Sequence, residues 1–150
     1  MAMRDVMDDQ RAMAAVKAAL TEDVGEGDAT TLALVDPAAR ATGEILAREA
    51  CRVAGGTVAS AVLACIDPEL RVAVVVPDGQ PVEPGGTILT IEGKAASILT
   101  AERTALNFMQ RMCGIATLTA RFVEAVQAHG TMILDTRKTT PNLRLFEKYA

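Results

Sequence analysis

Six consecutive polar residues, 135–140, follow a short apolar run near the C-terminal end of the sequence, and they include the adjacent cations Arg137 and Lys138. The apolar run, 131–134, consists of β-branched and other apolar side chains between a glycine and a later proline, as is typical of a buried parallel strand. Ligands of α/β folds bind at the carboxyl ends of such strands, and guanidinium and ammonium groups suit carboxylates and phosphates. The spacing therefore predicts a strand ending at about Asp135 and an anion site at Thr136, Arg137 and Lys138.

A second interpretation of the same residues is a solvated loop in which Thr140 caps the next helix and Pro141 occupies its first position. The sequence pattern alone leaves both interpretations open. Arg103, one helical turn before Asn107, is a further candidate for binding a ligand. From its spacing alone, Arg103 is better explained as a surface arginine paired with a nearby acid.

The amino-acid composition of the chain disfavours several classes of function. The chain has 150 residues, half of them apolar, with a net charge of −4 and only 3% aromatic residues. These values favour a globular domain and argue against a general nucleic-acid or membrane-surface binder. Three cysteines without CxxC spacing, and no apolar leader or membrane-length run, lead us to expect the reducing cytoplasm. The only histidine, His129, precedes a glycine at an expected helix end, so chemistry that depends on Ser-His sites or metal-ligand triads is disfavoured.

Most of the remaining sequence predicts alternating helices and strands. Apolar periodicity predicts a long helical region at 95–129, which Gly114 is expected to break in two, and a last helix at 142–149. The acidic, glycine-containing stretch 22–31 is expected to form a structured turn rather than a calcium loop, because its ligand spacing fails. The other expected elements are helices at 11–20 and 57–66 and strands at 41–48, 70–76 and 87–92. Since a buried parallel strand needs neighbours on both sides, the unit after residue 130 reads as the first piece of a larger barrel or sheet, and the chain as a fragment.

The sequence resembles the quinolinate phosphoribosyltransferases, also called decarboxylating nicotinate-nucleotide pyrophosphorylases. Four blocks carry the resemblance, in family order: 22–30; 47–49 with Ala54-Gly55; 101–108 with 114–117; and 135–141 with Leu143-Arg144 and 147–150. Asn142 departs from the expected glycine, and Met109 and Cys113 are mild variations. The chain stops at about half the family's length, before a His-Arg pair, a lysine and two acidic residues that line the family's site.

The resemblance implies an α/β (α+β) fold. An N-terminal α/β sandwich-like domain would occupy residues 1–114, and residues 115–150 would form a linking helix and the first strand-helix unit of a truncated βα barrel. It also implies a homodimer or higher even oligomer, because the family's sites are completed by the neighbouring chain. The polar run 135–140, which contains Arg137 and Lys138, is called the cationic segment below. A stiff helical span of about 30 residues, on the order of 45 Å, separates Arg103 from this segment and suggests that a partner subunit supplies Arg103.

The resemblance further implies an enzyme of NAD biosynthesis, a pentosyltransferase. Quinolinate and phosphoribosyl pyrophosphate would give nicotinate mononucleotide, pyrophosphate and carbon dioxide, with Mg²⁺. By resemblance, Arg103, Thr136, Arg137 and Lys138 bind these anionic substrates, with Arg137 on a quinolinate carboxylate. Fixed cations would stabilise charge on the leaving pyrophosphate without a side-chain nucleophile. The 150-residue chain alone is expected to be inactive.

Two alternative functions remain open from the sequence. The stretch 82–94 resembles the approach to the modified lysine of a biotin or lipoate carrier, with Lys94 in the modified position. Carrier lysines lie on a hairpin between strands, whereas a long helical pattern follows Lys94. The other alternative is a related phosphoribosyltransferase-like protein with a different aromatic acid as substrate.

Overall fold

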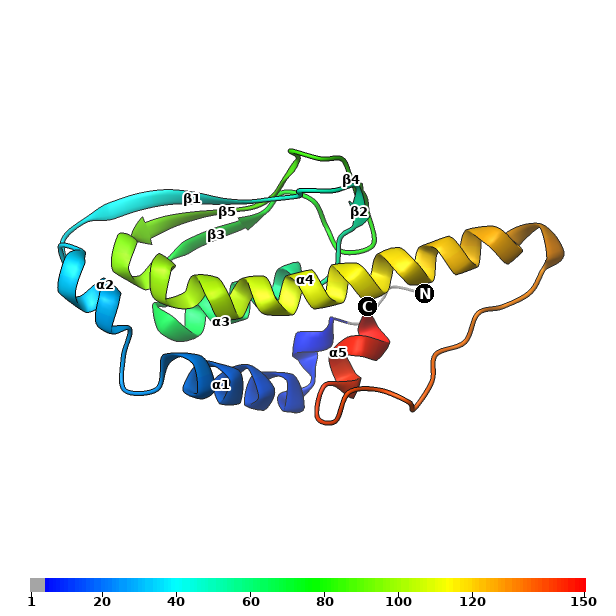
Figure 1. Cartoon of the computed structure of the whole chain (residues 1–150), viewed down its shortest axis with the longest axis horizontal. Helices are drawn as coiled ribbons and strands as arrows, with labels where there is room; N and C mark the ends of the chain where they lie inside the picture. Colours follow the sequence, from blue (N-terminus) through cyan, green and yellow to red (C-terminus); the bar gives the residue numbers. More distant parts are fainter. Residues whose placement is uncertain (1–4) are drawn as a thin grey trace.

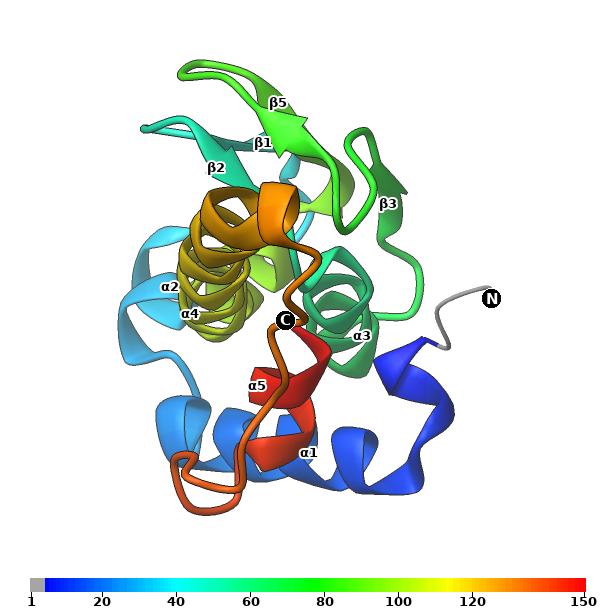
Figure 2. The ribbon, with the colours of Figure 1, turned by 90° about the vertical axis from the view of Figure 1, so that its right-hand side faces the viewer.

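The chain folds into stacked layers of sheet and helices, seen in a computed structural model that describes residues 5–150. A small antiparallel sheet lies on one side, α3 (Gly56–Ile66) and α4 (Ala95–Val126) lie beneath it, and α1 (Gln10–Val24) and α5 (Arg144–Tyr149) lie beneath those helices (Figures 1 and 2). The remaining elements are η1 (Val6–Asp8), α2 (Ala29–Leu34), β1 (Arg40–Leu46), β2 (Cys51–Arg52), β3 (Arg71–Val74), β4 (Pro81–Val82), β5 (Thr87–Lys94) and η2 (Gln127–His129).

The sheet has the order β1-β5-β3, with antiparallel pairing on both sides of β5. Its register places Gly43 of β1 and Val72 of β3 opposite Ile91 of β5, and a bulge follows Ile45 in β1. Along β5, Leu89 and Ile91 point to the same face of the sheet and are almost inaccessible to solvent; Ile88, on the other face, is also buried. The short strands β2 and β4 form a separate antiparallel pair.

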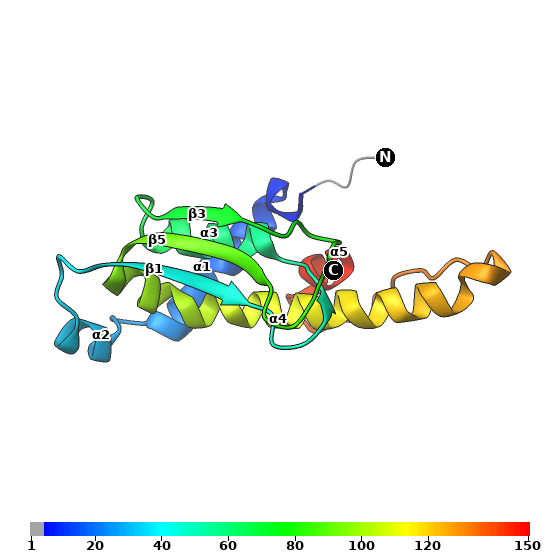
Figure 3. The same ribbon diagram turned by 90° about the horizontal axis from the view of Figure 1, so that it is seen from above.

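Helix α4 is the longest element of the described residues and runs along most of the length of the molecule (Figure 3). Its N-terminal two thirds pack against α3, β2, α1 and the sheet, which explains why its apolar stripe is unusually broad. The residues buried on α4 are Ile98, Ala101, Thr104, Ala105, Met109, Met112, Cys113 and Ala116. Beyond these residues α4 extends past the compact body, turns at η2 and Gly130, and the chain then returns along α4 to α5 (Figures 1 and 3).

Most of the sequence-based predictions agree with these elements. The expected helix at 57–66 is α3, and the expected strands at 41–48, 70–76 and 87–92 are β1, β3 and β5. The mixed α/β fold class is confirmed. The turn predicted at 22–31 forms only at 25–28, because α1 continues to Val24 and Asp28 caps α2 by accepting hydrogen bonds from the Thr31 N–H and hydroxyl. The short strands β2 and β4 were not predicted.

The break predicted at Gly114 is wrong, because α4 continues without interruption to Val126. A glycine inside a helix costs only about 1 kcal/mol relative to alanine, which is little compared with the burial of the apolar stripe on both sides of it. The domain division at residues 114/115 therefore falls inside a single helix and stays a prediction.

The strand predicted at 131–135 is also wrong for this chain. These residues have no regular secondary structure, and Met132 and Leu134 are 78% and 75% exposed. A strand is defined by hydrogen bonds to neighbouring strands, and no strand in the described part of the chain lies beside this segment. The apolar residues 131–134 are present, but the described chain supplies no neighbouring strand with which they could pair.

The last helix forms close to its expected position, although it begins at Arg144 rather than at Asn142. Thr140 does not cap it: the residue before the helix is Leu143, and no side chain caps the α5 N-terminus. Phe146 is 2% exposed and packs on Phe108 of α4, with ring centroids 5.0 Å apart and planes inclined by 56°. Leu143 and Leu145 pack beside the core, so α5 is docked by its apolar face.

Candidate functional site

Three of the candidate residues, Thr136, Arg137 and Lys138, lie on the segment 131–140 that leads back to α5 (the return segment), and all three are exposed. Lys138 donates its backbone N–H to the Thr136 hydroxyl at 3.1 Å, and the Arg137 carbonyl accepts from Arg144 Nη2 at 3.3 Å. Between residues 5 and 150, no acid forms an ion pair with Arg137 or Lys138. Both cations are therefore available to an anionic ligand, although a cavity of about 940 Å³ beside them takes in Asp135 and none of the three.

Helix α5 contacts both side-chain and backbone atoms of this segment. The Lys148 side chain pairs with the Asp135 carboxylate at 2.9 Å, at the start of the segment. Arg144 Nε donates to the Thr139 hydroxyl at 3.1 Å, and Glu147 Oε2 accepts from the Thr140 N–H at 3.1 Å. The charged residues of α5 thus engage the residues on both sides of the cationic pair and leave the pair's own side chains unpaired.

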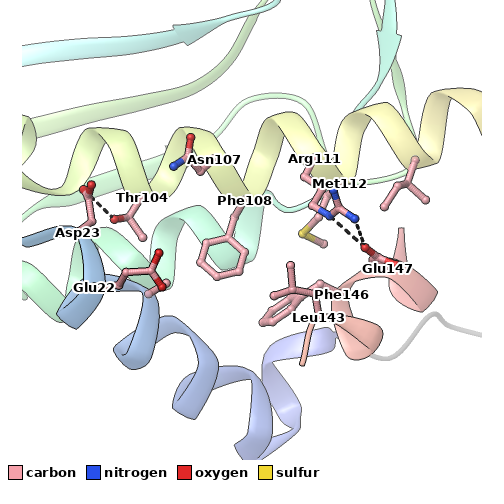
Figure 4. A pocket seen from close by; sticks show the side chains of 12 residues that line it. Glu22, Asp23, Thr104, Asn107, Phe108, Arg111, Met112, Leu143, Phe146 and Glu147 are labelled. Carbon is pink, nitrogen blue, oxygen red and sulfur yellow. Dashed lines mark hydrogen bonds and ion pairs between the residues drawn. The ribbon is translucent and has the colours of Figure 1, made fainter. Parts of the chain in front are cut away.

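Arg111 of α4 completes this arrangement. Its Nε donates to Glu147 Oε1 at 3.0 Å, and its Nη2 donates to the same oxygen (Figure 4). The Arg111 Nη2 also donates to the Thr140 hydroxyl. The Arg111 hydrogen bond, followed by those from Thr140, lowers the pKa of the Glu147 carboxyl below its usual range. Thr140 is held at its backbone and its hydroxyl, which ties the end of the cationic segment to α4.

Arg103, the fourth candidate residue, lies on the exposed side of α4, with 75% of its side chain accessible. Its Nη1 pairs with Asp23 Oδ1 at the end of α1 at 3.2 Å, and the Thr104 hydroxyl donates to Asp23 Oδ2 at 3.3 Å. Within this chain Arg103 thus behaves as the surface arginine that its spacing predicts. Such exposed pairs stabilise a fold by less than about 1 kcal/mol, so Asp23 can release Arg103 at little cost.

A pocket of about 300 Å³ lies between these two groups of residues. Asp23 and Thr104 lie at one end of it, Arg111 and Glu147 lie at the other, and Phe108 and other apolar side chains line the space between them (Figure 4). Arg103 and Arg111 are eight residues apart on a continuous helix, which corresponds to about 12 Å along its axis. The pocket therefore lies between Asp23, which pairs with Arg103, and Glu147, which accepts from the Thr140 N–H; neither Arg103 nor residues 135–140 line it.

This arrangement corrects the argument from chain length about Arg103. The estimate of about 45 Å assumed a straight path from Arg103 to the cationic segment. The chain instead reverses at η2 and returns along α4, so that Thr140 contacts Arg111. Helix length alone thus gives no reason for a partner subunit to supply Arg103.

The described residues do not fit a protein-held metal ion. Across residues 5–150, no group of three or more histidine, cysteine, aspartate or glutamate side chains is placed to bind one. No helix in the same range is long and apolar enough to cross a membrane. Lys94 ends β5 immediately before α4 and pairs with Glu69 at 3.2 Å, so it is not on the exposed hairpin that a biotin or lipoate carrier requires.

Sequence reasoning did not identify Arg111, Arg144, Glu147 and Lys148 as parts of the site. The charge pattern of the last helix could have indicated three of them, because Arg144, Glu147 and Lys148 alternate there with the apolar Leu143 and Phe146. Arg111 lies on α4, where its sequence neighbours give no such signal. Their partners on the return segment could not have been inferred, because the path of that segment depends on tertiary contacts.

Comparison with known proteins places most of the chain in one family. Residues 28–113 match the model of the quinolinate phosphoribosyl transferase N-terminal domain, and residues 115–150 match that of the C-terminal domain. The chain is 44% identical over 136 residues to "Quinolinate phosphoribosyltransferase [decarboxylating] 1" of Nicotiana glauca, covering 90% of this chain and 38% of that protein. It is 39% identical over 131 residues to the "Probable nicotinate-nucleotide pyrophosphorylase [carboxylating]" of a Synechocystis strain, covering 87% of this chain and 44% of that protein.

Solved structures agree with this result. The nicotinate-nucleotide pyrophosphorylase from Francisella tularensis superimposes with a TM-score of 0.88 at 35% identity, covering 93% of this chain and 50% of that one. NadC from Streptococcus pyogenes gives a TM-score of 0.87 at 44% identity, covering 91% of this chain and 48% of that one. The present chain therefore spans about half the length of these structures and less than half that of the two relatives.

Proposed function

Because this chain belongs to the quinolinate phosphoribosyltransferase family, we propose that it contributes to phosphoribosyl transfer onto quinolinate in NAD biosynthesis. In this reaction the ring nitrogen of quinolinate replaces pyrophosphate at the ribose C1 carbon, and loss of carbon dioxide gives nicotinate mononucleotide. The names of the relatives state this activity. Because the chain covers less than half the length of each of these two relatives, the activity is proposed for it.

The observation that carries the proposal is the pair of cations at Arg137 and Lys138, which is held at its flanks and is not neutralised by an acid of the described chain. Quinolinate carries two carboxylates and the sugar donor carries several phosphate charges. A protein with a net charge of −4 must concentrate positive charge locally to bind them. We assign Arg137 to a quinolinate carboxylate, Lys138 to the quinolinate or phosphate side, and a hydrogen bond beside them to Thr136.

Arg103 belongs to the same proposed site. Its partner Asp23 would be replaced by a substrate anion, which is feasible because the pair is exposed and weak. In the transition state the ribose carbon becomes cationic and the pyrophosphate gains negative charge, so fixed cations lower the barrier by stabilising the leaving group. None of these steps needs a side-chain nucleophile.

Magnesium and the oligomeric state also remain proposals. Mg²⁺ keeps several waters and commonly binds through substrate phosphates, so we propose that the donor's pyrophosphate brings it and that no described residue holds it alone. We propose a homodimer or higher even oligomer in which the neighbouring chain completes each site, as the family resemblance implies. Cytoplasmic localisation is part of the proposal and agrees with three unpaired cysteines, although some relatives are named chloroplastic or mitochondrial.

The test is a direct product assay. Protein expressed from the complete reading frame that contains these residues is mixed with quinolinate, phosphoribosyl pyrophosphate and Mg²⁺, and nicotinate mononucleotide and carbon dioxide are measured. We expect both products in equal amounts, and we expect no turnover from the 150-residue chain alone. Turnover with nicotinate or another aromatic acid in place of quinolinate would identify a related transferase with a different substrate. Absence of transfer to any such acid would overturn the proposal.

A further inference from the structure

Two carboxylates lie in or beside the cationic segment, and each forms an ion pair with a cation of a helix. Asp135 pairs with Lys148 at 2.9 Å, and Glu147 accepts from Arg111 Nε at 3.0 Å. Asp135 is only two residues from Arg137 in the chain and could otherwise pair with it. Cations of α4 and α5 therefore pair with both acids, and the side chains of Arg137 and Lys138 have no ion-pair partner among residues 5–150.

Arg111 is the only one of these helix cations that reaches the segment from α4. Its guanidinium contacts Glu147 through both Nε and Nη2 and the Thr140 hydroxyl through Nη2, and Glu147 in turn accepts from the Thr140 N–H. Only 11% of the Glu147 side chain is exposed, compared with 49% of the Arg111 side chain. A carboxylate that is so nearly buried needs a cation beside it, because burial disfavours an unpaired charge.

We propose that Arg111 is a positioning residue for substrate binding. By tying Glu147 and Thr140 to α4, it fixes the segment that carries Arg137 and Lys138, and it keeps the Glu147 charge from neutralising them. The ligand class is a multiply charged carboxylate or phosphate, and this inference rests on the proposed function. Arg111 itself would not touch the substrate.

Loss of Arg111 has two separable consequences. The segment is released at Thr140, which increases the population of open conformations. Glu147 also loses its cation and becomes a competitor for Arg137 and Lys138, which weakens their attraction for anions. Arg111→Gln removes both functions, Arg111→Lys keeps the charge but cannot form the same fork, and Glu147→Gln removes the carboxylate while keeping its shape.

The first measurement does not depend on catalysis. Trypsin cleavage after Arg137 and Lys138 is followed by mass spectrometry on the 150-residue chain, with Arg121→Gln as the control. Arg121 lies on the exposed part of α4 and has no ion-pair partner in the range 5–150. Because cleavage follows the open population, we expect Arg111→Gln to raise the rate about tenfold, Glu147→Gln to raise it in the same direction, and the control to match the unaltered chain.

The second measurement separates positioning from a purely structural role. In protein from the complete reading frame, Arg111→Gln should raise the KM for quinolinate and for the sugar donor by about tenfold, with kcat within about twofold. Glu147→Gln should raise KM less than Arg111→Gln, because it leaves no competing charge. Arg111→Lys should fall between the Arg111→Gln and unaltered values.

The outcomes separate the two proposals. If unaltered protein shows no turnover, the proposed function fails and the proteolysis result alone decides whether Arg111 positions the segment. Equal cleavage rates for Arg111→Gln, Glu147→Gln and the control overturn the inference. So does a kcat loss with unchanged KM, since Arg111 would then act in the transition state. If Arg111→Gln does not fold, Glu147→Gln decides by the same criteria.

Discussion

Replacing Gly55 with alanine should destabilise the fold strongly, because two independent constraints meet at this residue. Gly55 precedes α3 with φ +94°, a backbone conformation that costs a residue with a side chain about 1–2 kcal/mol. An added Cβ would also lie 2.8 Å from Met112 Sδ of α4, which is too close. Met112 is 2% exposed, so moving it disturbs a packed core and costs about 1–3 kcal/mol more.

Gly79 provides a matched control for this prediction. It also has a positive φ, +84°, but an added Cβ there would meet nothing within 4 Å, so Gly79→Ala tests the backbone cost alone. We expect Gly55→Ala to lose about 2–5 kcal/mol of unfolding free energy and Gly79→Ala about 1–2 kcal/mol. Urea denaturation of the two variants and the unaltered chain measures the difference. Equal losses in both variants would refute the contact between Gly55 and Met112 as a packing constraint.

Three further predictions concern α4 and the site. Gly114→Ala should stabilise the chain by about 1 kcal/mol, since Gly114 lies inside a continuous helix with free space around it; thermal unfolding measures this, and a loss of stability would indicate a break in the helix. The pKa of Glu147 is lowered from its ordinary 4.5 by Arg111 and Thr140, so its stabilising effect is complete above that value and is lost as the pH falls through the lower folded-state pKa. Glu147→Gln should therefore flatten the acid side of a stability-against-pH curve, and an unchanged curve would contradict the hydrogen bonds described here. Finally, Arg103→Ala and Arg137→Ala should each remove most activity from protein of the complete reading frame, and mixed dimers of the two should regain part of it if the neighbouring chain supplies Arg103; no recovery despite proven subunit exchange would assign Arg103 to its own chain.

The sequence predicted those parts of the fold that local patterns determine. Alternation and β-branched residues predicted β1 and β5, and the apolar periodicity of residues 95–129 predicted α4. The helix break predicted at Gly114 does not occur, because the local cost of a glycine, about 1 kcal/mol, is smaller than the packing energy along α4. The sequence pattern could not determine whether residues 131–135 pair as a strand, because pairing depends on neighbours distant in the sequence.

The same distinction applies to the candidate site. The run of polar residues predicts Arg137 and Lys138 as binding residues, and in the structure no acid of residues 5–150 pairs with them. The residues that support this segment, above all Arg111, escaped prediction because their role arises from the way the chain returns along α4. Charge type and spacing can thus suggest which residues bind, whereas tertiary contacts identify the residues that position them.

The most direct test of the central claim is the effect of Arg137 on substrate binding, because the proposed function depends on this exposed cation. Kinetic constants of Arg137→Gln and of the control Arg121→Gln are compared in protein from the complete reading frame, with quinolinate and the sugar donor varied separately. We predict that Arg137→Gln lowers kcat/KM for quinolinate by about 100-fold, as expected for the loss of a charged hydrogen-bonded contact, while the control stays within about twofold. Equal kcat/KM values for the two variants would contradict the assignment of this segment as the substrate-binding site.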